Sequence, residues 1–327
     1  MPSFITHDIF AKEVYNKLDK KIQNTIKDEL VLYQTFAQSH DYLFYYKTLN
    51  IRETRRINWI GKIGHRRNTK DYIINIIKTI KRFHLENYKP DIAYLFGSIT
   101  HYVLDYTCHP LIFYKTGIYD PYKKIESHKK YKGMHALMEK SIDAYYYEKI
   151  YKQKYKNANI SKDIIKKPKL SIDLITLINM VYKKTYNIDS VGLYYKISIK
   201  RAKLIYKLFI QDKFGIKIKL YRIIEKLKRM NKDTLCCFST SYKYNKKYLN
   251  LNHKKWNHPC DKNRYYEDSF EDLFNQSIEK CIKIITSVYK VLYENEDINT
   301  LDKIIPNVSY STGLDLNNNK PMKYFEY

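Results

Sequence analysis

The chain has 327 residues, 44% of them hydrophobic, which is enough for one large domain or two ordinary ones with a sizeable core. It contains only 8 Gly and 8 Pro, and because both punctuate chains of turns and strands, their scarcity favours a mostly helical protein. The five cysteines are odd in number and form no CxxC pair, which argues against a disulfide framework. No segment approaches about 18 consecutive apolar residues and no signal peptide is evident, so we expect no transmembrane helix and a cytoplasmic location.

The net charge is strongly positive, +26 from 60 Lys and Arg against 34 Asp and Glu. Such a charge favours attraction to anionic partners, either a membrane surface or nucleic acid. Compositional drift explains it equally well, because the abundant Lys, Ile, Asn and Tyr all have AT-rich codons. Charge bears on solubility and association rather than on fold, so both interpretations stay open.

Several helical stretches are predicted before residue 89. They are a helix capped by Thr6 or Asp8 and running to about Leu30, an aromatic-rich piece over 30–46, a short apolar segment over 58–64, and a helix from Asn68 or Thr69 to about Tyr88. Pro90 then suits the first turn of the next helix, where its missing N–H is harmless.

The segment 92–111 is predicted to be a buried helix that carries three polar side chains on one face. His101, Asp105 and His109 recur every four residues, and each step of four returns to nearly the same side of a helix. The surrounding residues are apolar, so an ionised Asp105 without a partner would cost several kcal/mol. A divalent cation removes that cost, although a lone buried His or Asp is more often a hydrogen-bonded core residue.

The second polar series follows a predicted interruption. Pro110 is expected to break or kink the helix, and a loop to about Ser127 leads to a helix over 128–151. In that helix His135, Glu139 and Asp143 again fall at steps of four. The stretch 155–170, rich in Lys and Asn, is predicted to be a solvated linker or loop.

The remaining chain is predicted to be helical but poor in chemistry. Helices are expected over 172–184, 194–230 and 269–295, with an irregular polar stretch over 231–263 and a loop after Asp297. The basic faces of the 194–230 region fit membrane-surface helices. A solvated face over a buried apolar stripe is the commoner arrangement and is favoured here.

Histidines concentrate in the first 136 residues and, with carboxylates, form a candidate metal-ligand set. Zinc sites and polynuclear phosphoesterase sites use these donors, and helical bundles commonly build such clusters in their cores. The candidates are His7, Asp41, His65, His101, Asp105, His109, His135 and Glu139.

The segments that carry these residues resemble the zinc-dependent phospholipase C family, which is related to the P1/S1-type nucleases. The resembling segments are THDIF, AQSHDYLFYY, GKIGHRRNT, AYLFGSITHYVLDYTCHP, GMHALMEKSID and, more distantly, LNHKKWNHPCDKNRYYEDSFEDLF. The resemblance implies an all-α, multi-helix bundle with a polynuclear zinc site in its core. It implies a catalytic core over 1–155, with 156–327 as a helical C-terminal extension that packs on this core.

The resemblance also implies two or three zinc ions and a ligand set for each. One ion would take Asp41, His65, His101 and Asp105; a second would take His109, His135 and Glu139; a third would take His7, with Asp105 bridging. In the family the third ion also takes the terminal amine of a processed Trp, which this chain lacks. Removal of Met1 would leave the Pro2 amine five residues before His7, a spacing that the related nucleases show.

Metal-assisted phosphodiester hydrolysis is the leading functional hypothesis. Asp41 would orient or deprotonate the attacking water. By resemblance the substrate is a phospholipid, cleaved between glycerol and phosphate to leave diacylglycerol and a phosphorylated head group. The basic charge allows contact with an anionic membrane surface, and nucleic acid is a less favoured partner.

Two other functions stay open. One is a single-strand nuclease of the P1/S1 kind, which the charge would suit but the absence of a signal peptide and disulfides would not. The other is a non-catalytic basic protein that binds membrane or nucleic acid. His40 and Asp41 also match the dipeptide of HD-type phosphohydrolases, a weak signal that leaves the other histidines unexplained.

Residues near the candidate ligands have expected supporting roles. His40 is interpreted as structural, and Asp143 is expected to hydrogen-bond a ligand histidine. Four aromatic residues either line the entry or belong to the ordinary core, the latter being favoured; they are Tyr42, Phe44, Tyr45 and Tyr46.

Overall fold

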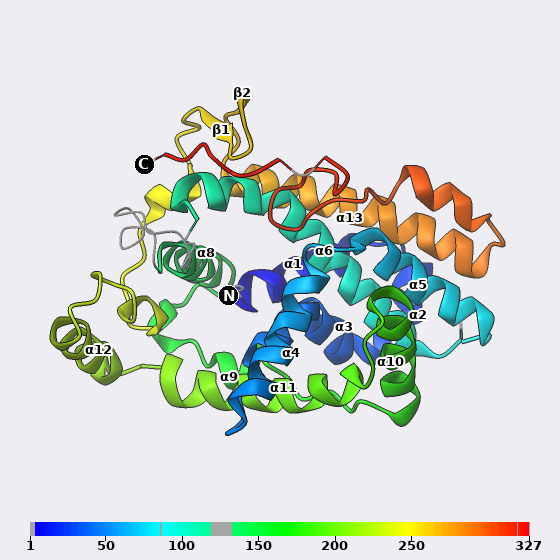
Figure 1. Cartoon of the computed structure of the whole chain (residues 1–327), viewed down its shortest axis with the longest axis horizontal. Coiled ribbons are helices and arrows are strands. Elements are labelled where there is room, and N and C mark those ends of the chain that lie inside the picture. Colours follow the sequence, from blue (N-terminus) through cyan, green and yellow to red (C-terminus); the bar gives the residue numbers. More distant parts are fainter. Residues whose placement is uncertain (1–3, 86, 119–132, 319, 327) are drawn as a thin grey trace.

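The computed structural model describes residues 4–85, 87–118, 133–318 and 320–326, and it confirms the all-α fold class. The helices pack together in a bundle, and the one two-stranded hairpin of the described ranges lies at one end (Figure 1). Across the described ranges, no helix is long and apolar enough to cross a membrane. All five cysteines are free and buried, as the absence of a disulfide framework predicts.

The helices in the first half of the chain differ in their bounds from those predicted. They are α1 Phe4–Lys17, α2 Lys20–Ile26, the 3-10 turn η1 Lys27–Glu29, α3 Leu30–Phe36, the 3-10 helix η2 Ser39–Tyr45, α4 Ile51–Gly64, α5 Thr69–Arg82, α6 Lys89–Thr116 and α8 Met134–Tyr151. The single helix predicted to reach Leu30 is wrong, because Asp19 ends it and caps α2 by accepting from the Lys21 N–H. Thr6 and Asp8 lie inside α1 rather than at its cap. The predicted loop and helix start over 119–132 lie outside the described residues.

The central helix α6 is buried along most of its length and begins with Pro90 in its first turn, as predicted. The predicted break at Pro110 is wrong, because α6 continues to Thr116. Proline removes one helical hydrogen bond, the one to the carbonyl four residues earlier, which belongs to Tyr106. Gly313, from the C-terminal segment, packs directly against that carbonyl. Leu111 and Ile112 in the turn after Pro110 are buried in the core, and this packing keeps the helix intact.

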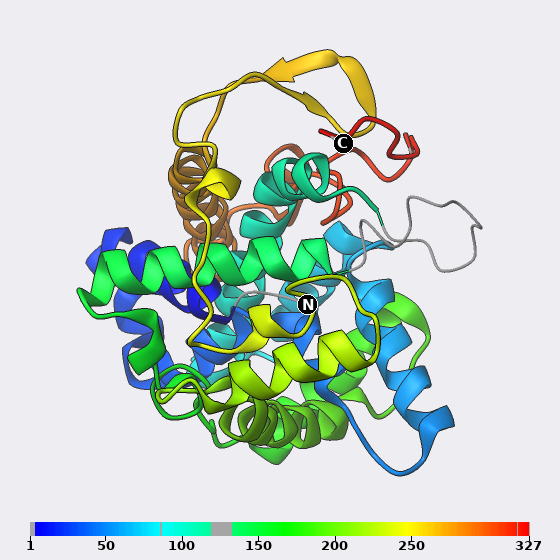
Figure 2. The same cartoon turned by 90° about the vertical axis from the view of Figure 1, so that its left-hand side faces the viewer.

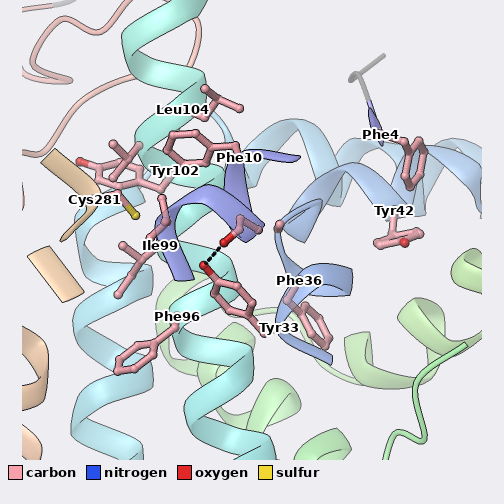
Figure 3. Packing of buried hydrophobic residues seen from close by; sticks show 14 of the residues in the cluster. Phe4, Phe10, Tyr33, Phe36, Tyr42, Phe96, Ile99, Tyr102, Leu104 and Cys281 are labelled. Carbon is pink, nitrogen blue, oxygen red and sulfur yellow. Dashed lines mark hydrogen bonds between the residues drawn. The ribbon is translucent and has the colours of Figure 1, made fainter. Parts of the chain in front are cut away.

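The hydrophobic core is built around α6, with α3 on one side and α13 (Phe270–Tyr293) on another. Figure 3 shows Tyr33 of α3, whose hydroxyl donates to the Ala11 carbonyl of α1, close to Phe36. Gly97 allows α3 to approach α6 closely, because a Cβ there would lie 2.5 Å from the Tyr33 carbonyl oxygen. Cys281 of α13 is fully buried in the same core.

The second half contains further helices and the hairpin. Their bounds are η3 Tyr155–Asn157, α9 Ile160–Asp163, α10 Ile172–Tyr186, α11 Val191–Ile205, the π-helical η4 Tyr206–Ile210, α12 Ile216–Leu227, η5 Cys236–Phe238, η6 Lys246–Leu249, β1 Trp256–His258, β2 Asp261–Tyr266 and η7 Ile298–Lys303. Ser269 caps α13 with a reciprocal capping box, which explains the accurate prediction of its start.

Four predictions for this half are wrong. The stretch 155–170 is not solvated throughout, because Tyr155, Ile160 and Ile165 are buried in the core. The predicted helix over 194–230 is interrupted between η4 and α12, and the antiparallel pair β1–β2 was not expected. The apolar stripe of α12 is exposed rather than buried.

Helices α1 and α8 are joined by buried polar contacts beside the candidate ligands. The Thr6 N–H and hydroxyl both donate to Asp143 Oδ1, at 2.9 and 2.8 Å. Lys140 Nζ lies 3.6 Å from Asp143 Oδ2 and donates to the Tyr206 hydroxyl at 2.7 Å. Asp143 therefore bonds Thr6 and not a histidine, and the expected contact is wrong. The contact fixes the position of α1, which carries the next residue, His7.

Replacing Asp143 by Ala should destabilise the protein by about 3–5 kcal/mol, because it leaves the Lys140 charge buried without its carboxylate. Thr6→Val removes only one hydroxyl donor and should cost about 1 kcal/mol. Urea unfolding of both variants measures the difference. Equal losses of unfolding free energy in the two variants would show that the Asp143 carboxylate does not stabilise the buried Lys140 charge.

Candidate metal centre

The eight candidate ligands converge at the centre of the bundle, and we refer to them as the histidine–carboxylate cluster. Five elements supply them: α1 (His7), η2 (Asp41), the end of α4 (His65), α6 (His101, Asp105, His109) and α8 (His135, Glu139). Figure 1 shows α1, α4, α6 and α8 grouped around this region. Residues far apart in the chain thus share one site.

The first group within the cluster surrounds two buried aspartates. His65 Nε2 lies 3.0 Å from Asp41 Oδ1, and His7 Nε2 lies 3.3 Å from Asp105 Oδ1. His101 Nε2 lies 3.6 Å from an oxygen of each aspartate. His65 Nε2 and His101 Nε2 are only 3.4 Å apart. One donor atom each from His7, Asp41, His101 and Asp105 lie within 4.8 Å of one another, a spacing that could hold a metal ion.

The second group lies one turn further along α6. His135 Nε2 is 3.0 Å and His109 Nε2 is 3.6 Å from Glu139 Oε1. The two imidazole rings are stacked with centroids 5.7 Å apart. His109 Nδ1 lies 3.7 Å from Asp105 Oδ2, so Asp105 stands between the two groups.

Three of the histidines are oriented by main-chain carbonyls through Nδ1. His65, His101 and His109 bond in this way to the carbonyls of Gly61, Ala37 and Tyr310, at 2.7, 3.2 and 2.9 Å respectively. A carbonyl only accepts, so Nδ1 of each ring must carry the hydrogen, and the Nε2 lone pair of the neutral ring points into the cluster. This arrangement is the usual outer support of a metal-binding histidine.

The end of α4 explains how His65 reaches the site. The last turn of a helix leaves carbonyls without helical partners, and the His65 ring binds one of them, that of Gly61. Gly64 leaves space for the His40 ring, which a Cβ there would meet at 2.5 Å. His40 Nδ1 in turn contacts the Tyr182 hydroxyl at 2.6 Å. His40 thus packs against the end of α4, next to His65, and is itself held by Tyr182.

Burial and mutual charge shift the pKa values of the cluster. Burial lowers the pKa of His101 well below its ordinary value, and it raises the pKa of Asp41. Burial alone would raise the pKa of Asp105, but His109, His101 and His7 together bring it below its ordinary value. Burial alone would lower the pKa of His109, yet Asp105 and Glu139 raise it to about 9. The carboxylates therefore attract positive charge to the second group.

An open pocket of about 350 Å³ leads to the cluster. It is lined by Asp41, Phe44, Lys62, His65, Arg66, Asp105, His109, Phe113, His135, Glu139 and Ser311. The exposed Lys62 and Arg66 make its rim basic. Phe44 alone among the four aromatic residues of its segment lines the pocket, while the other three are buried in the core, as favoured; Tyr42 lies there beside Phe4 in Figure 3.

The C-terminal segment supplies a part of the site that sequence reasoning missed. The Tyr310 N–H donates to the His65 carbonyl at 3.1 Å, and the Tyr310 carbonyl accepts from His109. Its neighbour Ser311 lines the pocket. No local pattern marks these residues, which lie 201 or more positions after the histidines that Tyr310 contacts. Lys62 and Arg66, by contrast, flank His65 in sequence and were recognisable from that position.

Another carboxylate group lies apart from the cluster, at Glu225, Asp233 and Cys236. Glu225 Oε1 already accepts from the N–H groups of Leu235 and Cys236, at 2.6 and 3.1 Å. These bonds fix a turn, so main-chain donors satisfy this carboxylate.

The sequence matches the model of a protein family described as zinc dependent phospholipase C, over residues 6–188. The match covers more than half of the chain and includes all eight residues of the histidine–carboxylate cluster. The chain therefore belongs to the zinc-dependent phospholipase C family. No curated protein and no solved structure matches it.

The cluster is chemically compatible with zinc, which binds imidazole nitrogen and carboxylate oxygen. Asp41 Oδ2 and Asp105 Oδ2 are buried and have no hydrogen-bond partner among the described residues. An ionised carboxylate in such a position is costly unless a cation lies beside it. The donor set and these two oxygens both favour bound divalent cations. Met1 and Pro2, whose amine was considered as a further ligand, lie outside the described residues.

In the metal-free protein, His109 should keep its proton up to about pH 9, because of Asp105 and Glu139. Since its folded-state pKa is above the ordinary 6.5, the resulting stabilisation is complete below pH 6.5 and is lost as the pH rises through about 9. The measurement is the imidazole NMR titration together with unfolding free energies across this range. His109→Gln should abolish this part of the pH dependence; an unchanged pH profile in that variant would contradict the assignment.

Proposed function

We propose that the histidine–carboxylate cluster binds two or three zinc ions and hydrolyses the phosphodiester of a phospholipid. The observation that carries the proposal is the convergence of five histidines and three carboxylates, of which three histidines and all three carboxylates line an open pocket. Membership of the zinc-dependent phospholipase C family supports the reaction class. The products would be diacylglycerol and a phosphorylated head group.

The geometry supports a division of the ligands between ions. Asp41, His65, His101 and Asp105 would hold one ion, since their donor atoms lie 3.0–3.7 Å apart in successive pairs. His109, His135 and Glu139 would hold a second ion. His7 would serve a third with Asp105, whose Oδ1 lies near His7 and whose Oδ2 lies near His65 and His101. This third position is the one that a terminal amine would complete.

When bound, zinc lowers the pKa of a coordinated water toward neutrality and offsets charge on the phosphoryl oxygens. Asp41 would orient that water or accept its proton, because this carboxylate lies at the pocket floor and has one oxygen unbonded among the described residues. Water would attack phosphorus, the bond between phosphorus and the glycerol oxygen would break, and that oxygen would take a proton. The reaction consumes water alone.

The pocket walls would bind and position the substrate. Lys62 and Arg66 at the rim would attract the phosphodiester anion and hold it over the cluster. Phe44 contacts the His65 ring, with centroids 5.8 Å apart, and Phe113 is a second apolar residue of the pocket wall. These rings would contact the glycerol portion or, for a choline head group, its cation.

Metal content tests the cluster directly. Protein purified without chelator should contain two or three zinc ions per chain by elemental mass spectrometry. His101→Ala should reduce this number, because it removes a nitrogen from the first group. His253→Ala is the control, since His253 is exposed and distant from the cluster. Absence of metal even after zinc is offered would sink the enzyme proposal.

Asp41→Asn should lower kcat on a phospholipid substrate by about 100- to 10,000-fold, the usual contribution of general acid–base catalysis. Asp91→Asn is a matched control, because Asp91 is also fully buried but lies at the other end of α6. Burial raises the pKa of Asp91 to about 7, so a neutral amide suits its surroundings.

Parallel assays on phosphatidylcholine, a chromogenic phosphodiester and single-stranded DNA would separate the competing functions. Release of diacylglycerol that depends on Asp41 would support the phospholipase. Cleavage of DNA alone would indicate a nuclease, and activity on none of the substrates by zinc-loaded protein would contradict catalysis.

A further inference from the structure

Exposed apolar side chains concentrate on one part of the molecule, formed by α11, η4 and α12, which we call the α11–α12 surface (residues 191–229). Twenty large apolar residues of the described chain are exposed, and half of them lie here. They are Leu193, Ile197, Leu204, Leu208, Phe209, Phe214, Ile216, Leu220, Ile223 and Leu227. Soluble monomers rarely expose apolar residues in such density without an interaction that uses them.

The helix α12 shows the feature most clearly. Ile216, Leu220, Ile223 and Leu227 follow one another at steps of four, three and four, and therefore share one face of the helix. They are 52–78% exposed, whereas Ile218 on the opposite face is buried. The helix thus turns its apolar stripe outward, while its buried residues are Ile218 and Glu225.

The charge of the α11–α12 surface is almost entirely positive. It carries twelve basic residues: Lys196, Lys200, Arg201, Lys203, Lys207, Lys213, Lys217, Lys219, Arg222, Lys226, Lys228 and Arg229. Its two acidic residues, Asp212 and Glu225, are both buried. Asp212 accepts from the Lys217 and Ile218 N–H groups, and Glu225 from those of Leu235 and Cys236. No carboxylate within this surface is therefore available to neutralise an external partner's cations.

The α11–α12 surface is held in place and reaches toward the catalytic pocket. Figures 1 and 2 both show α11 and α12 along the lower side of the molecule, with α12 at its outer edge in Figure 1. Tyr221 of α12 donates to the Phe209 carbonyl at 2.5 Å, which ties α12 to η4. Tyr194 of α11 accepts from Arg56 of α4 at 2.5 Å, and α4 ends at His65 in the cluster.

We propose that the α11–α12 surface docks the protein on an anionic phospholipid bilayer. The apolar stripe would enter the interface while the lysines and arginines bind lipid phosphates, as in basic amphipathic helices that lie on membranes. The inference deepens the proposed function and rests on it, because hydrolysis of phospholipids is the reason that the protein would contact a bilayer. Docking would place the Arg56 region of α4 near lipid, and α4 continues from there to the pocket rim.

Two other occupants fit the surface less well. A second copy of the chain would bring two sets of twelve basic residues together, and this repulsion opposes a symmetric dimer. Nucleic acid would satisfy the charge, but exposed leucine and isoleucine side chains gain nothing from phosphates or stacked bases. A bilayer satisfies both the apolar stripe and the charge.

Vesicle co-sedimentation of the full chain tests the proposal. The protein should bind phosphatidylcholine vesicles containing phosphatidylserine more tightly than pure phosphatidylcholine vesicles, and salt should weaken this binding. The double variant Leu220→Asp, Ile223→Asp should lower the partition coefficient by about tenfold or more, because it removes apolar area and adds negative charge. Both side chains are exposed, so circular dichroism and thermal unfolding should match the wild type.

The control is Val31→Asp with Leu251→Asp, which removes two exposed aliphatic side chains elsewhere and changes the net charge equally. It should bind vesicles as the wild type does. Equal weakening by both double variants, or self-association of the wild type that Leu220→Asp, Ile223→Asp abolishes, would overturn the membrane assignment.

A soluble short-chain phosphatidylcholine below its micelle concentration separates docking from catalysis. Leu220→Asp, Ile223→Asp should hydrolyse it at the wild-type rate. Hydrolysis of this substrate without any vesicle binding would overturn the docking proposal and leave the function standing. Vesicle binding without hydrolysis of this substrate would overturn the proposed function and leave the docking proposal standing.

Discussion

The burial of three carboxylates in the middle of a helical bundle is the constraint on which the rest of this structure depends. Asp41, Asp105 and Glu139 are almost wholly buried, and charged groups with so little contact with solvent need close compensation. Histidines surround them, and main-chain carbonyls fix the orientation of three of these rings. The ends of η2 and α4, the central turns of α6, and α8 must all meet at this point. The proposed zinc ions would supply the positive charge that the imidazoles alone do not.

The same constraint explains how distant parts of the chain are recruited. Tyr310 contacts two cluster histidines through its main chain, so the C-terminal segment closes the site that the first half of the chain builds. Asp143 and Lys140 play a comparable part on the other side, where they fasten α1 to α8 through Thr6. The zinc-dependent phospholipase C match ends at residue 188, yet the site is completed well beyond it.

Local sequence patterns predicted which candidate ligands share a helix face better than they predicted the bounds of the helices. Steps of four place His101, Asp105 and His109 on one helix face whatever the remaining chain does, because helical geometry is local. The start of α13 was equally accessible, since its capping box is a local pattern. Continuation of α6 through Pro110 depended on tertiary packing against Gly313, and the role of Tyr310 depended on a contact across 201 positions. Exposure of the α12 stripe could not be predicted either, because periodicity identifies an apolar face but not whether another part of the chain covers it.

Two features of the surface complement the buried site. The pocket rim is basic, and α4 runs from this rim toward the α11–α12 surface, where exposed apolar and basic side chains alternate. A lipid-hydrolysing enzyme needs both a site that binds a phosphodiester and a means of reaching a substrate that lies in a bilayer. We propose that the cluster binds the phosphodiester and that α11 and α12 bring the protein to the bilayer.

Anomalous diffraction at the zinc absorption edge, from crystals of protein purified without chelator, tests the central claim most directly. The account predicts one peak among Asp41, His65, His101 and Asp105 and another among His109, His135 and Glu139, with any third peak beside His7. Absence of peaks in the cluster, or a peak only at Glu225, Asp233 and Cys236, would contradict it.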